Sequence, residues 1–277
     1  CVPDPVTYTG VLPIGESTVR YLAELLAGER ARRGTRAGRR ALDPVGQAVL
    51  VLRWFLDANR VVRLAADNEV STATAYRYLH EGIDVLASAA PGLHGALLAA
   101  RAAGHTHVSL DGTLIATDRC RALGPTAGVD LWWSGKHHRH GGNIQVVTAP
   151  DGWPLWTSQV RPGREHDTRC VRTHPGLLDT LAAFTDDTHA ALGDLGYEGE
   201  ADRLTVPFKP VPGGGRTVNQ RTVNSLHSAV RALAERGNAL LKTTFAALRR
   251  VTLCPWRIGA ITAAALVLLH IEHNRTT

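Results

Sequence analysis

Residues 105–119 read HTHVSLDGTLIATDR, and this stretch decides the fold. The apolar residues Val108 and Leu110 stand two positions apart. Ser109 and Asp111 alternate with them, and this period of two predicts a strand with one buried face. Asp111 therefore lies in the middle of a half-buried strand. An ionised carboxylate in that position loses much of its hydration, so a cation or a hydrogen-bond donor must compensate. A divalent metal ion is the cation that we expect.

Two further acids stand where they can join Asp111 at such an ion. Asp194 follows the short apolar run at residues 190–192 and precedes a glycine-rich turn. This pattern predicts an acid at the C-terminal end of a strand, where open α/β sheets keep their sites. Glu235 lies within residues 224–250, whose apolar residues recur at helical spacing. The acids thus come from two predicted strands and one predicted helix.

The predicted helix at residues 224–250 carries two cations beside its acid. Arg231 lies four residues before Glu235, and Lys242 lies seven residues after it, so all three project from one helix face. A single acid of this kind is more often a surface ion-pair partner than a metal ligand. The order and the neighbours of the three acids together favour the catalytic interpretation. Four other acids are the alternative ligands: Asp118, Asp130, Glu165 and Glu198.

These residues belong to motifs in which the chain resembles the DDE superfamily of transposases, and within it the insertion-sequence-five and insertion-sequence-four groups of bacterial mobile elements. The motifs are, in chain order, Asp111-Gly112-Thr113, Gly135-Lys136-His137, Pro162-Gly163, His166-Asp167, Gly193-Asp194-Leu195-Gly196-Tyr197 and Arg231-x3-Glu235-x6-Lys242. They cover residues 105–272 in the order of the family. One position departs, because the tyrosine that often precedes the motif arginine by three residues is Ser228 here.

The resemblance implies an α/β fold with a ribonuclease-H-like mixed sheet flanked by helices, preceded by an all-α helix-turn-helix domain. We expect a helical DNA-binding region at residues 1–95 and a catalytic domain at residues 96–277. The catalytic domain should run strand, strand, strand, helix, strand, strand, helix, with the second strand at residues 129–134 and the third at residues 143–149. The activity implied is that of a transposase, which binds the ends of a mobile DNA element and catalyses metal-dependent strand cleavage and strand transfer.

The resemblance makes Asp111, Asp194 and Glu235 both the catalytic residues and the metal ligands. A carboxylate cluster without matched histidines or thiols favours Mg²⁺ or Mn²⁺ over zinc. Two ions per active site would activate a water or a DNA 3′-hydroxyl and stabilise the leaving oxygen. No protein nucleophile is required by this chemistry.

Several residues around the acids are candidate DNA contacts. Arg231 and Lys242 would neutralise phosphates beside the scissile bond. Lys136 and His137 lie in a predicted hairpin loop at residues 136–140, near the DNA backbone. The three histidines within residues 137–140 leave a zinc or nickel site as the alternative. His166 should brace the site or meet a phosphate. Asp167 should cap a helix that runs to about residue 184.

Residues 61–86 have the pattern of a helix-turn-helix, with a turn at residues 67–70 and a serine cap on the second helix. Ala75, Tyr78 and Leu79 should pack inward. The candidate DNA contacts on this unit are Ser71, Thr72, Thr74, Tyr76 and Arg77. An ordinary helical hairpin that never touches DNA is the alternative.

The chain ahead of this unit holds three further predictions. Three prolines make residues 1–13 an extended arm, and Ser17 should cap a helix at residues 17–29. Six arginines within residues 30–40 fit a solvated linker or a phosphate-contacting loop equally well. Asp43-Pro44 should begin the next helix, as an N-cap followed by a proline at the first helical position.

Composition bounds the function without deciding it. The chain has 277 residues, 44% of them hydrophobic, and a net charge of +6, which suits a polyanionic partner. We expect that partner to be double-stranded DNA, at both the element ends and the target, bound by a homodimer. The four cysteines form no C-x-x-C pair, which argues against a zinc knuckle or a disulfide scaffold and fits a reduced cytosol. The resemblance implies a bacterial cytoplasmic, nucleoid-associated protein, and we expect no membrane partner. The alternative function is a catalytically silent or domesticated helix-turn-helix regulator.

Overall fold

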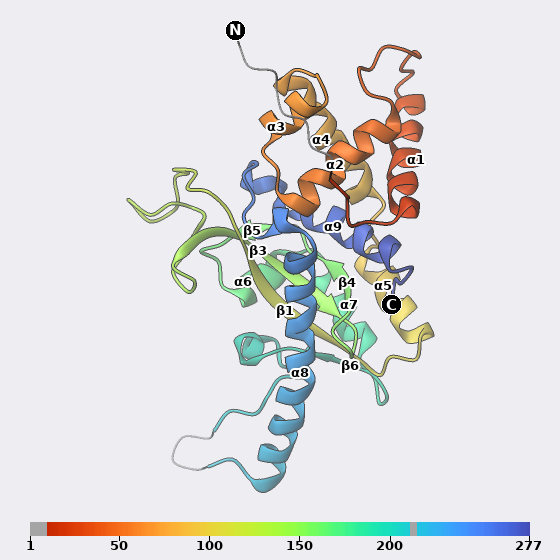
Figure 1. Cartoon of the computed structure of the whole chain (residues 1–277). Helices are drawn as coiled ribbons and strands as arrows, with labels where there is room; N and C mark the ends of the chain where they lie inside the picture. The colour runs from red at the N-terminus through yellow and green to blue at the C-terminus, as the bar shows by residue number, and fades with distance from the viewer. Residues whose placement is uncertain (1–9, 211–214) are drawn as a thin grey trace.

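The computed structural model describes residues 10–210 and 215–277 of the chain (Figure 1). A curled mixed sheet lies in the middle, and a group of helices from the first third of the chain covers one end of it. Residues 1–9 of the predicted arm lie outside the described residues.

The described helices and strands follow in two lists. The helices are α1 (Glu16–Arg32), α2 (Pro44–Asp57), α3 (Val61–Asp67), α4 (Thr72–Ser88), α5 (Leu93–Ala102), α6 (Asp167–Thr173), α7 (Leu177–Phe184), α8 (Val218–Thr244) and α9 (Ile258–Glu272), with short 3₁₀ segments η1 (Leu195–Glu200), η2 (Ala246–Leu248) and η3 (Pro255–Arg257). The strands are β1 (His107–Ala116), β2 (Trp133–Ser134), β3 (Arg139–Thr148), β4 (Pro154–Thr157), β5 (Arg161–Pro162) and β6 (Ala190–Leu192).

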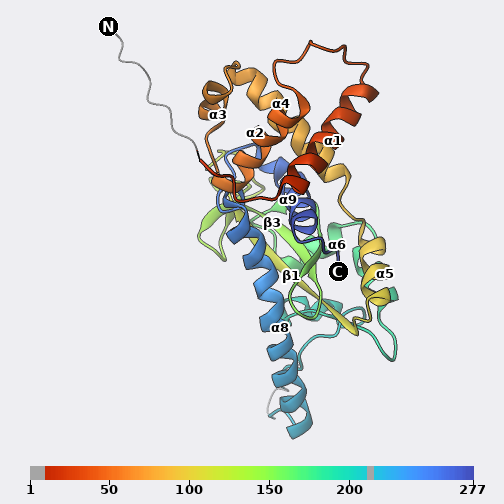
Figure 2. The ribbon, with the colours of Figure 1, turned by 45° about the vertical axis from the view of Figure 1, so that its right-hand side comes forward.

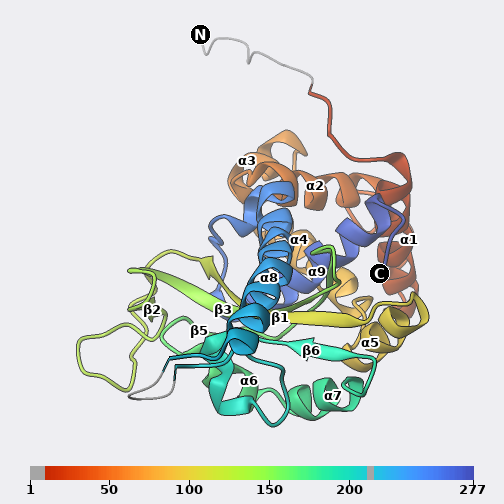
Figure 3. The ribbon, with the colours of Figure 1, turned by 90° about the horizontal axis from the view of Figure 1, so that it is seen from below.

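Strands β1 and β3 form the centre of the sheet. They pair antiparallel over most of their length, and β2, β4 and β5 also pair antiparallel with β3. On the other side of β1, β6 pairs parallel. Figure 3 shows α6 and α7 on one side of β1 and β6, with α8 and α9 on the other side. The mixed sheet with helices on both faces confirms the predicted α/β class.

The element order differs from the prediction in four places. Two short strands, β4 and β5, stand between the third strand and the first helix of the catalytic region. The second strand, expected at residues 129–134, is only the two residues of β2. The fifth strand is reduced to one parallel bridge between Leu192 and Thr205. The helix predicted from Asp167 to about residue 184 is divided into α6 and α7 at Pro175-Gly176. Proline disfavours helical geometry in the residue before it, and Gly176 takes a left-handed φ of +70°.

In the first third of the chain, two of the three predicted helix N-caps form as expected. Asp43 caps α2 by accepting from the Gly46 N–H, and Ser71 caps α4 by accepting from the Thr74 N–H, as predicted. Ser17 is not a cap, because α1 begins one residue earlier with Gly15 at the N-cap position. The Gly15 N–H instead donates to the Glu272 carboxylate at the far end of the chain. A long-range contact thus replaces the local cap.

Helix α9 joins the helical third to the sheet. It is buried on nearly all sides, packs along α4, and lies against β4, where the His270 ring donates to the Pro154 carbonyl at 2.7 Å. One buried apolar cluster extends from Leu22 in α1 to Leu269 in α9. The division into regions 1–95 and 96–277 stays a prediction.

Helix α8 is the longest described helix. It begins at Val218, earlier than predicted, because Thr217 and Gln220 form a capping box there. Figure 2 shows its C-terminal half lying along the sheet while its N-terminal half extends beyond it. Among the described helices, no single one is long and apolar enough to cross a membrane. By length and composition alone, α4 and α5 taken together are long and apolar enough, but a bend of 51° separates them.

Candidate active site

Asp111 stands at the middle of β1, opposite Val146 of β3. It shares a face of the strand with Ser109 and Thr113, and α8 covers this face. The side chain of Asp111 is 19% exposed. Alternation along the strand therefore delivers one carboxylate into a mostly buried position beneath a helix, as the sequence predicts.

Asp194 is carried to the same level by the parallel pairing of β6 with β1. Ser109 lies opposite Leu192, so the residues two positions further along each strand are Asp111 and Asp194. One Asp194 oxygen accepts from the Gly196 N–H at 2.8 Å, which caps η1 and fixes the turn after the strand. The other oxygen faces α8, where it meets Arg231.

A stripe of four polar residues on α8 runs along Asp111 and its neighbours. The stripe consists of Arg231, Glu235, Asn238 and Lys242, at helical spacings of four, three and four residues. Asn238 donates to Asp111 Oδ2 at 2.8 Å. Lys242 donates to Thr113 Oγ1 at 2.6 Å and to the Leu114 carbonyl at 3.1 Å. Three of the four residues thus hold α8 against β1 or β6.

Arg231 bridges the two aspartates. Its Nη2 atom lies 3.8 Å from Asp111 Oδ1 and 3.6 Å from Asp194 Oδ2. The guanidinium therefore stands between the two carboxylates as their shared cation. A positive charge there offsets the repulsion that two nearby carboxylates would otherwise exert.

Burial raises the pKa of Asp111 from 3.8 to about 6. Arg231 lowers this pKa, whereas the carboxylates of Asp194, Asp167 and Glu235 raise it. Burial thus weakens the hydration of the ionised form, and three neighbouring carboxylates oppose that form as well. An added cation would therefore stabilise the ionised carboxylate.

Glu235 makes no contact with Asp111 or Asp194 in the described structure. It lies on the same stripe, between Arg231 and Asn238, but its side chain is exposed. Across residues 10–210 and 215–277, no three His, Cys, Asp or Glu side chains gather closely enough to hold a metal ion. The three acids predicted as ligands therefore share one region, with two of them brought together and the third beside them.

Two observations bear on whether a divalent cation fits these residues. One cationic nitrogen of Arg231 already lies within 4 Å of both aspartates, so their oxygens face a common point. Asn238 Oδ1, next to Asp111, is buried and has no hydrogen-bond partner in the described part of the chain. A spare buried acceptor suits a water molecule on a hydrated cation, and the oxygen-only donors suit Mg²⁺ or Mn²⁺. The residues fit such an ion.

A family comparison matches this region. The model described as DDE superfamily endonuclease matches residues 110–270, which include every residue of the stripe and both aspartates. The chain belongs to this family. No curated protein matches the chain.

Solved structures offer only a distant likeness to this DDE superfamily endonuclease. One is described as the Mos1 transposase paired-end complex with left transposon end, with 12% identity, coverage of 88% of this chain and 83% of that chain, and a TM-score of 0.22. Another is the Mos1 Strand Transfer Complex, with 13% identity, coverage of 88% and 82%, and a TM-score of 0.22.

Asp167 of this endonuclease is not the helix cap that the sequence predicts. His166 occupies the N-cap position of α6 without a side-chain cap bond, and Asp167 is the first helical residue. The Asp167 carboxylate accepts from Asn143 Nδ2 at 2.7 Å and from Lys136 Nζ at 3.2 Å. It also lies against Gly112, where a Cβ would come within 2.2 Å of Asp167 Oδ1. Asp167 thus packs on the face of β1 opposite to Asp111.

A buried chain of hydrogen bonds supports this second face. The Tyr197 hydroxyl donates to Gln145 Oε1 at 2.5 Å, and Gln145 Nε2 donates to Asn143 Oδ1 at 2.8 Å. Asn143 then donates to Asp167. Tyr197 belongs to the turn that begins at Asp194, so the chain connects that turn to α6 across β3. This network, like Asn238, was missed by the sequence analysis; its only local signal is polar residues within an otherwise apolar strand.

The loop residues predicted to meet DNA remain predictions. Lys136 is exposed and paired with Asp167, while His137 and His166 are exposed without a side-chain hydrogen bond in the described structure. Arg139 and His140, expected in the loop, belong to β3. The alternative zinc or nickel site at residues 137–140 finds no support among the described residues.

The predicted contacts on α4 lie in the helical third, away from the α8 stripe. Thr72, Tyr76 and Arg77 are exposed, whereas Thr74 is half-buried. The residues expected to pack inward are Ala75, Tyr78 and Leu79, and all three are buried. The helix pair therefore has the predicted inward and outward faces, while DNA binding stays a prediction.

The four alternative acids have other partners. Asp118 pairs with Arg250, and Glu165 pairs with Arg161. Asp130 accepts from the Trp132 N–H, and Glu198 pairs with Lys209. Each of these acids is therefore engaged outside the Asp111–Asp194 pair.

Proposed function

We propose that this DDE superfamily endonuclease is a transposase of the insertion-sequence-five type from a bacterial mobile element. It binds the ends of that element as a homodimer and catalyses metal-dependent DNA cleavage and strand transfer. The observation that carries the proposal is the meeting of Asp111 and Asp194 around Arg231, beneath the helix that bears Glu235. The strand order around β1 also fits a ribonuclease-H-like domain.

The proposed catalytic residues are Asp111, Asp194 and Glu235, which would hold Mg²⁺ or Mn²⁺. Glu235 has an exposed side chain and is near enough to raise the pKa of Asp111, and the proposal is that a rotamer change turns its carboxylate toward Asp111 when metal binds. When bound, the ions supply the charge that activates a water or a DNA 3′-hydroxyl and stabilises the leaving oxygen. No step requires a covalent intermediate with the protein.

The chain's own cations have separate proposed roles. Arg231 neutralises the two aspartates and, when they bind metal, is free to turn toward a DNA phosphate. Lys242 fixes β1 through Thr113 and Leu114, so it sets the position of the strand that carries Asp111. Asn238 orients the Asp111 carboxylate. These residues position charge rather than transfer protons.

The test is Mg²⁺-dependent nicking of supercoiled plasmid by the full chain. Asp111→Asn should abolish nicking. Asp118→Asn is the control: Asp118 lies seven residues further along the chain and pairs with Arg250, so its change should leave nicking intact. Strand joining with a 3′-hydroxyl oligonucleotide then separates a transposase from a nuclease without strand transfer. Equal nicking by the parent and Asp111→Asn would overturn the proposal.

The second candidate is a helix-turn-helix regulator without turnover. The observation in its favour is that the acids do not form a three-residue metal site in the described structure. Tight duplex binding by the parent, with no nicking in Mg²⁺ or Mn²⁺, would favour this candidate.

A further inference from the structure

The arginine-rich segment at residues 30–40 comprises the end of α1 and the start of the loop to α2, and it contains two kinds of arginine. Its six arginines are Arg30, Arg32, Arg33, Arg36, Arg39 and Arg40. Four have side-chain partners: Arg30 bonds Gln47 and the Leu42 carbonyl, Arg32 bonds Glu29, and Arg33 and Arg40 reach Glu81. Within the described residues, Arg36 and Arg39 have none. The loop is therefore held in place by some of its arginines and leaves others unpaired.

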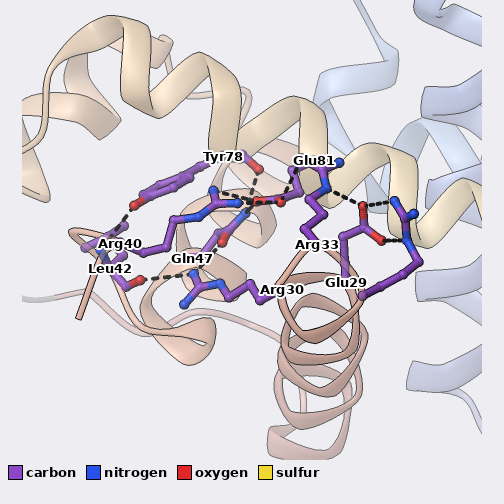
Figure 4. A network of polar contacts seen from close by, with 9 residues as sticks. Glu29, Arg30, Arg33, Arg40, Leu42, Gln47, Tyr78 and Glu81 are labelled. Atoms are coloured by element: carbon purple, nitrogen blue, oxygen red, sulfur yellow. Dashed lines mark hydrogen bonds and ion pairs between the residues drawn. The ribbon is translucent and has the colours of Figure 1, made fainter. Parts of the chain in front are cut away.

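Glu81 organises the paired arginines. It is 5% exposed, on the side of α4 that faces the loop. Arg40 contacts both of its oxygens at 2.9 and 3.1 Å, and Gln47 Nε2 donates to it at 2.9 Å (Figure 4). The Arg40 guanidinium also lies over the Tyr78 ring, 5.6 Å from its centre. A buried carboxylate with this many donors fixes the loop against α4.

A cleft of about 670 Å³ opens between this loop and α4. Its basic and hydroxyl-bearing lining residues are Arg33, Arg39, Arg40, Thr74, Arg77, Tyr78 and His80. The two acids in its wall are already paired, Glu81 with Arg40 and Asp84 with Arg257 at 2.5 Å. The cleft therefore keeps a surplus of positive charge.

Arg39 and Arg77 carry that surplus. Neither has a carboxylate partner in the described structure, and Arg77 contacts only the Thr74 hydroxyl, at 3.0 Å. Thr74 Oγ1 accepts from Arg77 and from the Ser71 hydroxyl, so its own hydrogen is available to a ligand. Burial lowers the pKa of His80 at the same wall, so this ring adds no charge at neutral pH. Two guanidinium groups and a hydroxyl thus line the same cleft.

We propose that this cleft binds a phosphodiester group of duplex DNA, with Arg39, Arg77 and Thr74 as the contacting residues. The inference rests on the proposed function, because DNA is the partner that the function supplies. Planar guanidinium groups bind phosphate oxygens in pairs, and phosphate contacts set the orientation of a helix on DNA. A phosphate held here would place the exposed face of α4, with Thr72 and Tyr76, beside the duplex.

Arg36 provides a matched control. It belongs to the same loop and is exposed and unpaired in the described structure, yet it does not line the cleft. Arg39→Gln, Arg77→Gln and Arg36→Gln all remove one charge without touching the Glu81 contacts. A diffuse electrostatic effect would weaken DNA binding equally in all three variants, whereas a built site would respond only to the first two.

The test is fluorescence anisotropy of the full chain with a labelled DNA duplex at several KCl concentrations. Arg39→Gln and Arg77→Gln should each weaken binding several-fold and lower the slope of log K against log[salt] by about one. Arg36→Gln should change both much less. The melting temperature of each variant should equal that of the parent, which checks that folding is unaffected.

Two outcomes would overturn the inference in distinguishable ways. If the parent binds duplex and the three variants are weakened equally, the cleft is not a phosphate site although the proposed function survives. If the parent binds no duplex, both fail. Added inorganic phosphate then tests whether the cleft binds a free anion instead of DNA. A melting temperature that phosphate raises for the parent but not for Arg39→Gln would make the cleft a site for a free anion.

Discussion

Asn238 on α8 donates a 2.8 Å hydrogen bond to the Asp111 carboxylate on β1, across 127 residues of sequence. This bond fixes which Asp111 oxygen is engaged and leaves the other facing Arg231. It also defines the level at which α8 lies on the strand, because Lys242, one turn further along, bonds Thr113 on the same strand face. The orientation of the central acid is therefore decided by the helix rather than by β1 itself.

Asn238→Ala should lower the plasmid nicking rate about 10- to 100-fold, the usual cost of removing a group that orients a metal ligand. The affinity for Mn²⁺, measured by calorimetry, should fall with it. Asn224→Ala is the control, because Asn224 lies on the same helix and bonds only the Phe208 backbone. Parent-like nicking and Mn²⁺ affinity in Asn238→Ala would contradict the orienting role.

The stability of the protein should depend on pH through Asp111. Its pKa is about 6 in the fold against 3.8 in a free chain, so the folded protein binds more protons between these values. The free energy of unfolding should therefore be highest below pH 4. It should fall as the pH rises from 4 through 6, by about 3 kcal/mol or less. Asp111→Asn removes this dependence.

Urea unfolding of the parent and Asp111→Asn at several pH values, without metal, measures the effect. The difference in unfolding free energy between the two proteins should shift in favour of the variant as the pH rises from 4 to 8. Parallel curves for the two proteins over this range would show that Asp111 is not held in a desolvated position.

Arg231→Gln should increase the stabilisation that Mn²⁺ gives. In the parent, a divalent ion must displace the Arg231 guanidinium from the two aspartates, and this displacement weakens metal binding. The variant has no guanidinium to displace. Without metal the variant should be the less stable protein, because Asp111 and Asp194 lose their shared cation. The shift of the melting temperature on adding Mn²⁺ should accordingly be larger for the variant than for the parent, and absent in Asp111→Asn. A smaller shift in the variant would mean that Arg231 supports the metal site instead of competing for it.

Gly112→Ala should destabilise the protein by about 1–3 kcal/mol, because an added methyl would stand 2.2 Å from Asp167 Oδ1 and 2.7 Å from Asp167 Cγ. Gly95→Ala in α5 is the control, since no atom lies within 4 Å of its added Cβ. Combining Gly112→Ala with Asp167→Ala should cost less than the sum of the two single changes. Chemical denaturation gives all four values, and additive costs would show that the two residues do not meet.

Part of the fold could be predicted because its signals are local. The alternation at Val108–Asp111 and the helical spacing of Arg231, Glu235 and Lys242 each predicted an element that the structure contains. Caps at Asp43 and Ser71 also formed as expected, since a cap needs only its neighbours. The prediction at Ser17 was wrong because a distant carboxylate, Glu272, serves the start of α1 instead.

The sequence by itself determined which acids stand at the middle of a strand, at the end of a strand and on one helix face, because period and spacing follow from backbone geometry. Only the tertiary structure decided that Ser109 lies opposite Leu192, which brings Asp111 and Asp194 level. It also placed Asp167 on the far face of β1 and left Glu235 beside the pair rather than in it. Strand register and helix docking depend on packing between segments far apart in the chain, and no local pattern encodes those contacts.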